Sequence, residues 1–126
     1  MAKLTVLSYQ CEEISEDIGS IVLKEVELSD PGPGEVRVRL KACAVNFPDL
    51  LMIQGKYQFK PPLPFAPGSE AAGDIEACGP ECDFKEGDKV IVSMRCGGFS
   101  EGVVVDQSQV RAIPEGMEYG PAASYQ

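Results

Sequence analysis

The fold class is decided by the run Glu35-Val36-Arg37-Val38-Arg39-Leu40-Lys41-Ala42, in which charged and apolar residues alternate. In an extended chain, successive side chains point to opposite faces, so the apolar members of this run share one face. The sequence therefore predicts a half-buried β-strand over residues 35–42. Pro31-Gly32-Pro33-Gly34 breaks the chain directly before this strand and marks its start.

Further short segments of strand character lie on both sides of this run. We expect strands at residues 3–9, 21–28, 71–78, 89–94, 98–105 and 110–113. An acidic turn at residues 12–19 and turn signals such as Glu86-Gly87-Asp88 separate them. Many short strands joined by frequent turns are typical of a β-barrel or β-sandwich.

Two internal segments do not fit the strand pattern. Residues 47–53 are apolar without alternation and lie between Asn46 and Gly55, which predicts a short helix that ends near a glycine. Residues 58–68 carry four prolines, each with a fixed φ and no N–H donor, so this segment must be extended and cannot be a central strand.

The last residues of the sequence resemble the opening of a helix. Residues 119–126 contain Pro121 in the position of a first helical turn, and the sequence stops about one turn later. A single turn is not a stable helix by itself. We therefore expect either that the chain has been cut here or that its final residues are disordered.

Composition excludes several function classes. A chain of 126 residues with 44% hydrophobic content suits one domain. A formal charge of −9 repels phosphate backbones, so nucleic acid is not an expected partner. Since no apolar run approaches the roughly 20 residues of a membrane-spanning helix, we expect no membrane span. Polar residues such as Thr5 and Ser8 interrupt any signal-peptide core, so we expect no signal peptide.

Cysteine and histidine usage narrows the chemistry further. The five cysteines are odd in number and widely spread, which argues against a disulfide framework and favours a reducing, cytoplasmic location. Histidine is absent, which removes Ser-His-Asp and Cys-His catalysis. Cys78 and Cys82 form the only close cysteine pair, and we interpret their spacing as accidental because no further thiols lie nearby in the sequence.

Four stretches, in this order, carry a family resemblance. They are Ala44-Val45-Asn46-Phe47-Pro48-Asp49, then Gly55-Lys56-Tyr57 with the run from Pro61 to Gly73, then Phe84-Lys85-Glu86-Gly87-Asp88-Lys89-Val90, then Gly97-Gly98-Phe99-Ser100-Glu101. Together they resemble the N-terminal, GroES-like domain of the medium-chain dehydrogenase/reductase superfamily, in its zinc-free quinone oxidoreductase branch. The resemblance implies a mainly β fold, a GroES-like partly open β-barrel with one or two short helices.

The resemblance also implies a domain plan. Residues 1–118 are expected to form the GroES-like, substrate-side domain, and residues 119–126 to begin the connection to a Rossmann domain that is missing here. No G-x-G-x-x-G loop follows a strand in this sequence, so we expect no tight cofactor binding by this chain alone.

The metal ligands of the zinc-dependent relatives are mostly replaced. Those relatives place a cysteine where this chain has Asn46 and a histidine where it has Ser69, while Glu70 persists. Because catalytic zinc usually needs three protein ligands, two replacements should abolish the site. We therefore expect no metal.

The resemblance implies hydride transfer from NADPH, or NADH, to a quinone or an α,β-unsaturated carbonyl compound. Asn46 should lie near the nicotinamide ribose, as a catalytic and cofactor-binding residue, and Tyr57 should line the substrate pocket as a catalytic hydrogen-bond donor. Many family members carry a second tyrosine at the position of Leu51, which is therefore expected in the substrate pocket but without a phenol. Simpler interpretations stay open: Asn46 as a helix cap, Tyr57 as a cover for the barrel rim, and Asp49 and Glu70 as internal hydrogen-bonding or ion-pair residues.

A different class of function competes with the enzyme hypothesis. The chain alone should be inactive, and it could instead be a binding or assembly module that uses the exposed interdomain face, for example as a homo-oligomer. A co-chaperonin role rests on the barrel fold alone, which does not imply function.

Overall fold

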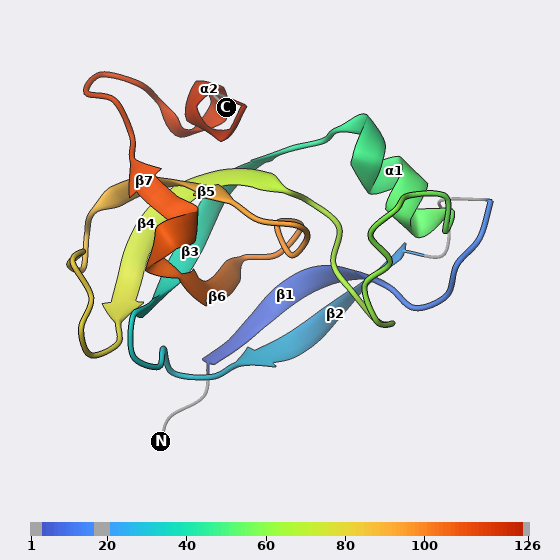
Figure 1. Cartoon of the computed structure of the whole chain (residues 1–126), viewed down its shortest axis with the longest axis horizontal. Helices are drawn as coiled ribbons and strands as arrows, with labels where there is room; N and C mark the ends of the chain where they lie inside the picture. Colours follow the sequence, from blue (N-terminus) through green and yellow to red (C-terminus); the bar gives the residue numbers. More distant parts are fainter. Residues whose placement is uncertain (1–3, 17–20, 125–126) are drawn as a thin grey trace.

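The computed structural model describes residues 4–16 and 21–124. Its elements are β1 (Leu4–Cys11), β2 (Ile21–Leu28), β3 (Glu35–Ala44), α1 (Phe47–Ile53), β4 (Glu70–Cys78), β5 (Lys89–Ser93), β6 (Gly102–Asp106), a 3-10 turn (Gln107–Gln109), β7 (Val110–Ala112) and α2 (Tyr119–Ala123). The strands form two antiparallel sheets, with α1 and α2 at separate places on the molecule (Figure 1). The predicted strand at 21–28 and helix at 47–53 have the bounds that the sequence indicated.

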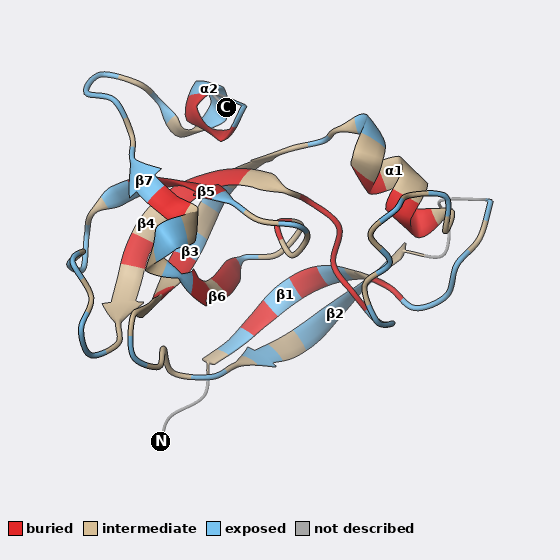
Figure 2. Cartoon of the chain, in the orientation of Figure 1, coloured by how far each residue is buried: buried red, intermediate tan, exposed pale blue. Residues whose placement is uncertain are grey.

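The larger sheet holds the main core. Its strand order is β6-β3-β4-β5-β7, so β3 pairs with both β4 and β6. The alternation that predicted β3 places Val36 and Val38 in the core with no exposed surface, while Arg39 is exposed. Ile75 from β4 and Val92 from β5 belong to the same buried cluster. Buried stretches lie along β4 and β5 (Figure 2). Burial of such aliphatic side chains is the dominant stabilising contribution to this sheet.

The smaller sheet pairs β1 with β2 from Leu4↔Leu28 to Cys11↔Ile21. The backbone of residues 99–101 joins it to the rest of the domain: the Tyr9 N–H donates to the Phe99 carbonyl at 2.8 Å, and the Glu101 N–H to the Leu7 carbonyl at 2.9 Å. The strand expected at 98–105 is therefore wrong over its first four residues, because β6 begins only at Gly102. These four residues are a loop whose backbone hydrogen bonds go to β1, to residues 67–68 and to Leu40 of β3.

The prediction of a mainly β, partly open barrel with one or two short helices is confirmed, since the two sheets do not close into a barrel over the described residues. The proline-rich segment contains no helix, and Phe65 exchanges backbone hydrogen bonds with Cys11 at the end of β1. Within residues 4–16 and 21–124, no helix is long and apolar enough to cross a membrane.

Helix α2 is only five residues long but packs firmly on the larger sheet. Ala122 and Ala123 are 0% and 2% exposed and contact a cluster that contains Ala72 and Ile91. The Tyr119 hydroxyl donates a hydrogen bond to Asp74 on β4. These contacts explain why a single turn persists. Lys3, residues 17–19 of the acidic turn and residues 125–126 lie outside the described residues, and the domain boundary at 118 stays a prediction.

Candidate functional site

The start of α1 is organised by Asn46 and Asp49. Asn46 is the N-cap residue, with extended backbone angles of φ −123° and ψ 159°, and Pro48 occupies the first turn. Asp49 is the third helical residue, and its carboxylate accepts a hydrogen bond from the Asn46 N–H at 2.8 Å. This exchange is one half of a capping box, which satisfies a backbone donor left free at the helix start.

Asp49 also ties α1 to the proline-rich segment. Its side chain is only 1% exposed, and its second carboxylate oxygen accepts a hydrogen bond from the Gly68 N–H at 3.1 Å. A buried carboxylate is costly unless hydrogen bonds compensate it, and here two backbone donors do so. The interpretation of Asp49 as an internal hydrogen-bonding residue is confirmed, and this residue fixes the position of Gly68 and Ser69 beside α1.

The Asn46 side chain points to a second carboxylate. Its amide nitrogen donates to Glu70 Oε1 at 2.5 Å, which joins the end of β3 to the start of β4.

The Cys43 thiol lies close to the carboxylates of Asp49 and Glu70. Burial, and then the charges of Asp49 and Glu70, raise the pKa of Cys43 to about 12. This thiol therefore stays protonated at neutral pH and is a poor nucleophile there.

A cleft of about 600 Å³ opens beside α1. It is lined by Pro48, Met52, Tyr57, Gln58, Phe59, Lys60, Ser69, Met94 and Arg95. Tyr57 and Ser69 thus line the same cleft. Asn46 is absent from this lining and lies one residue before α1, and Leu51 lies in α1 without lining the cleft. The roles of all three residues stay predictions.

The charges in this cleft are all positive. Lys60 and Arg95 line it, and no acidic residue does, although the whole chain carries −9. The Arg95 guanidinium lies 4.9 Å from the centre of the Phe59 ring, in the range of a cation–π contact. Lys60 Nζ donates to the Tyr57 carbonyl at 3.0 Å. Sequence reasoning missed Phe59, Lys60 and Arg95, because nothing local indicates that residues 57–60 meet residues 94–95.

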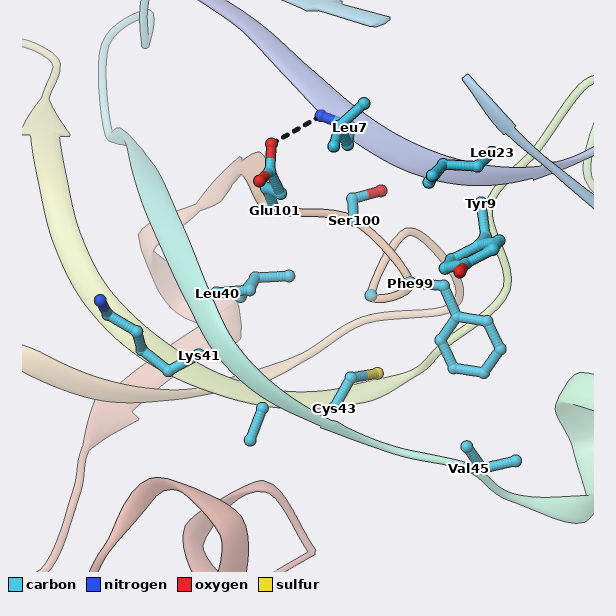
Figure 3. Close-up of a pocket in the computed structure, with 12 residues that line it drawn as sticks. Leu7, Tyr9, Leu23, Leu40, Lys41, Cys43, Val45, Phe99, Ser100 and Glu101 are labelled. Atoms are coloured by element: carbon cyan, nitrogen blue, oxygen red, sulfur yellow. Dashed lines mark hydrogen bonds between the residues drawn. The ribbon is translucent and has the colours of Figure 1, made fainter. Parts of the chain in front are cut away.

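A second cavity of about 570 Å³ lies between the two sheets (Figure 3). Apolar side chains from β1, β2, β3 and the 98–101 loop dominate its lining, with Leu7, Tyr9, Leu23, Leu40 and Phe99 among them. The Leu7 N–H donates to the Glu101 carboxylate at one edge. Lys41 and Glu101 also line this groove, but its surface is mostly apolar, which suits an apolar contact surface.

The described residues do not offer a good metal site. No three His, Cys, Asp or Glu side chains converge there in a way that could hold a metal ion. At the position of the relatives' zinc, Asn46 already donates its amide to Glu70, and Ser69 offers only a neutral hydroxyl. This donor set does not suit zinc, which prefers three protein ligands of the Cys, His and carboxylate types.

The fold and cleft together define a class. A partly open antiparallel β domain, with a short capped helix and a proline-rich segment that frame a cleft, is a GroES-like domain. The chain belongs to the alcohol dehydrogenase GroES-like domain family, whose pattern matches residues 32–115. Within the medium-chain dehydrogenase/reductase superfamily, it is of the type that forms the N-terminal domain of quinone oxidoreductases.

Relatives of known sequence support this placement. The chain is 38% identical to mouse "Quinone oxidoreductase-like protein 2" over 114 residues, which is 90% of this chain and 32% of that protein. It is 46% identical to human "Synaptic vesicle membrane protein VAT-1 homolog" over 95 residues, or 75% of this chain and 24% of that protein. The chain thus spans a third or less of the length of these curated relatives.

Solved structures give the same result. The crystal structure of the Pseudomonas syringae quinone oxidoreductase matches 94% of this chain and 36% of its own, at a TM-score of 0.86 and 31% identity. A probable oxidoreductase from Mycobacterium abscessus matches 95% of this chain and 38% of its own, at a TM-score of 0.89 and 33% identity.

Proposed function

We propose that this domain is the substrate-side half of an NAD(P)H-dependent, zinc-independent oxidoreductase that reduces quinones or α,β-unsaturated carbonyl compounds in the cytoplasm. The observation that carries the proposal is the cleft beside α1, where Tyr57 and Ser69 line a space of about 600 Å³ and the described part of the chain brings no set of metal ligands together. Relatives named as quinone oxidoreductases support the reaction class.

The cofactor must be held mainly by another domain. Over the described residues both sheets are antiparallel and the two α-helices have seven and five residues, so no parallel βαβ unit with a glycine-rich loop for a pyrophosphate is formed here. A bound nicotinamide supplies the hydride. We expect Asn46, which lies between β3 and α1, to contact the nicotinamide ribose. We also expect this chain alone to bind NADPH or NADH too weakly for turnover.

Tyr57 would stabilise the charge that develops during reduction. Its hydroxyl can donate a hydrogen bond to the substrate oxygen as negative charge builds on it, and a preorganised donor in a site that excludes water is effective in this role. Leu51 contributes no phenol, so one tyrosine must suffice. Arg95 and Lys60 add a positive potential, which favours quinones or enones that carry an anionic group.

Binding to the cleft is testable on this chain without a cofactor. We expect anthraquinone-2-sulfonate, a quinone without an open position for thiol addition, to bind with a Kd of roughly 1 mM or tighter. In NMR titrations, the amide signals of Tyr57, Ser69, Met94 and Arg95 should shift. Arg95→Ala should weaken binding about fivefold, as expected for loss of an exposed charge partner.

The control is Arg111→Ala, which removes the same charge from β7 and should leave the Kd unchanged. The neutral 2-(hydroxymethyl)anthraquinone should bind more weakly to the unaltered chain than the sulfonate does. Shifts confined to the groove of Figure 3, or equal Kd values for Arg95→Ala and the unaltered chain, would contradict a substrate cleft at this place.

A second candidate function is a non-catalytic assembly module. Val45, Phe47 and Leu23 are 79%, 69% and 53% exposed, and such apolar side chains favour association. In this case the occupant of the exposed face is a second copy of the chain. Sedimentation velocity distinguishes the two candidates, since a dimer that Val45→Asp dissociates supports assembly, whereas a monomer supports the oxidoreductase half.

A further inference from the structure

Two cysteine thiols meet at the far end of the larger sheet, away from the cleft. Cys78 is the last residue of β4, and Cys82 lies in the connection from β4 to β5. Glu70, which bonds Asn46, is the first residue of the same nine-residue strand, so roughly 26 Å of extended chain separates the two ends. This pair therefore belongs to no part of the site described above.

The two thiols lie close together, because both are hydrogen-bonded to the backbone of Phe84. The Cys82 thiol is near enough to contribute to the raised pKa of Cys78. Both are also fixed to one residue: Cys78 Sγ donates to the Phe84 carbonyl at 3.2 Å, and the Phe84 N–H donates to Cys82 Sγ at 3.4 Å. Both side chains pack against the main core cluster. The pair whose spacing the sequence left as accidental thus shares one backbone partner and one core cluster.

The connection that carries this pair is held from both sides. The Gly79 N–H donates to the Glu35 carbonyl at 2.9 Å, and the Gly34 N–H to the Pro80 carbonyl at 2.7 Å. On the other side, the Gln107 side chain accepts from the Asp83 N–H at 2.9 Å and donates to the Glu81 carbonyl at 3.1 Å. Cys78 and Cys82 are therefore kept near each other by backbone contacts that do not involve sulfur.

We propose that Cys78 and Cys82 form a reversible redox pair, which a peroxide or a disulfide oxidant converts into an intrachain disulfide. With hydrogen peroxide, one sulfur atom takes up oxygen as a sulfenic acid and water leaves. The second sulfur then displaces hydroxide, which leaves as water after it takes up the second thiol proton. In total, the two sulfur atoms lose two electrons and two protons, and the peroxide is reduced to two molecules of water.

Cys78 is a protonated thiol at neutral pH. Burial, the Cys82 thiol and the carboxylates of Asp88 and Glu86 raise the pKa of Cys78 to about 11, so its thiolate is rare at that pH. Burial and the Asp49 charge also raise the pKa values of Cys43 and Cys96. These two cysteines differ from the pair because neither has a thiol neighbour among the described residues.

The test uses the purified 126-residue chain, fully reduced and then treated with hydrogen peroxide or oxidised glutathione. We expect the intact mass to fall by two hydrogen atoms, three of the five thiols to remain titratable, and peptide mapping to join Cys78 to Cys82. Dithiothreitol should restore all five thiols. Oxygen adducts without a mass loss, a covalent dimer, or a disulfide mapped to any other pair would overturn the proposal.

Matched variants sharpen this result. Cys78→Ser and Cys82→Ser should each abolish the loss of two hydrogen atoms, whereas Cys96→Ser should form the disulfide at the rate of the unaltered chain. The mapping on the unaltered chain decides the question even if a variant fails to fold. The same mass loss in Cys82→Ser would also contradict the pair.

Discussion

Replacing Gly73 with alanine is expected to cost roughly 3 kcal/mol or more of folding free energy, a large share of the 5 to 15 kcal/mol typical of a domain. Gly73 lies in β4, where it pairs with Leu40 of β3 and Val90 of β5. A Cβ atom there would stand 2.0 Å from the Arg39 carbonyl oxygen and 2.9 Å from the Leu40 Cα. Both obstacles are backbone atoms of a central strand, so they cannot move aside without distorting the sheet.

Urea denaturation, with the free energy of unfolding extrapolated to water, measures this effect. Gly120→Ala is the matched control, because a Cβ at Gly120 in α2 meets no atom within 4 Å. We expect it to change stability by less than about 1 kcal/mol. If Gly73→Ala unfolded within 1 kcal/mol of the unaltered chain, the close approach of β3 and β4 described here would be wrong.

Asp49→Asn should have the second largest effect, a loss of about 2 to 4 kcal/mol. The Asp49 carboxylate accepts from two backbone donors, the N–H groups of Asn46 and Gly68. An asparagine side chain has one acceptor oxygen, so its NH₂ group would face one of these donors in a site that is 1% exposed. Asp83→Asn makes the same change on an exposed side chain and should be nearly neutral.

A second measurement separates loss of the Asp49 charge from loss of structure. The Asp49 charge contributes to the raised pKa values of Cys43 and Cys96, so its removal should lower both. At a fixed pH below about 12, iodoacetamide should then alkylate Cys43 faster in folded Asp49→Asn than in the unaltered chain. If Asp49→Asn and the unaltered chain had equal alkylation rates in native buffer and equal stability, the buried, hydrogen-bonded position of Asp49 beside Cys43 would be wrong.

The features that sequence predicted well are those that local patterns determine. Strand β3 follows from strict alternation, and α1 follows from an apolar run between Asn46 and Gly55. Four prolines excluded a helix from residues 58–68, as observed. The strand prediction was wrong over residues 98–101, because an extended, partly apolar stretch can pair with any strand edge. Here this stretch bonds to β1 rather than continuing β6.

The cleft could be predicted only in part, because its contacts join distant segments. The link from Asn46 to Glu70 spans 24 residues, and that from Asp49 to Gly68 spans 19. Tyr57 was found through the family resemblance, whereas the contact between Arg95 and Phe59 joins residues 36 positions apart that no local pattern links. Cys78 and Cys82 are close in sequence, yet their spacing alone did not indicate that both sulfur atoms would form hydrogen bonds with the Phe84 backbone.

We propose that this domain shapes a substrate cleft and that another domain must hold the nucleotide that delivers the hydride. The most direct measurement follows NADPH oxidation in the presence of a quinone with the purified 126-residue chain, checked for bound dinucleotide by fluorescence titration. We predict no turnover above the uncatalysed rate and no saturable NADPH binding below roughly 1 mM. Tight NADPH binding, or a kcat of roughly 1 per second or more, would contradict the claim.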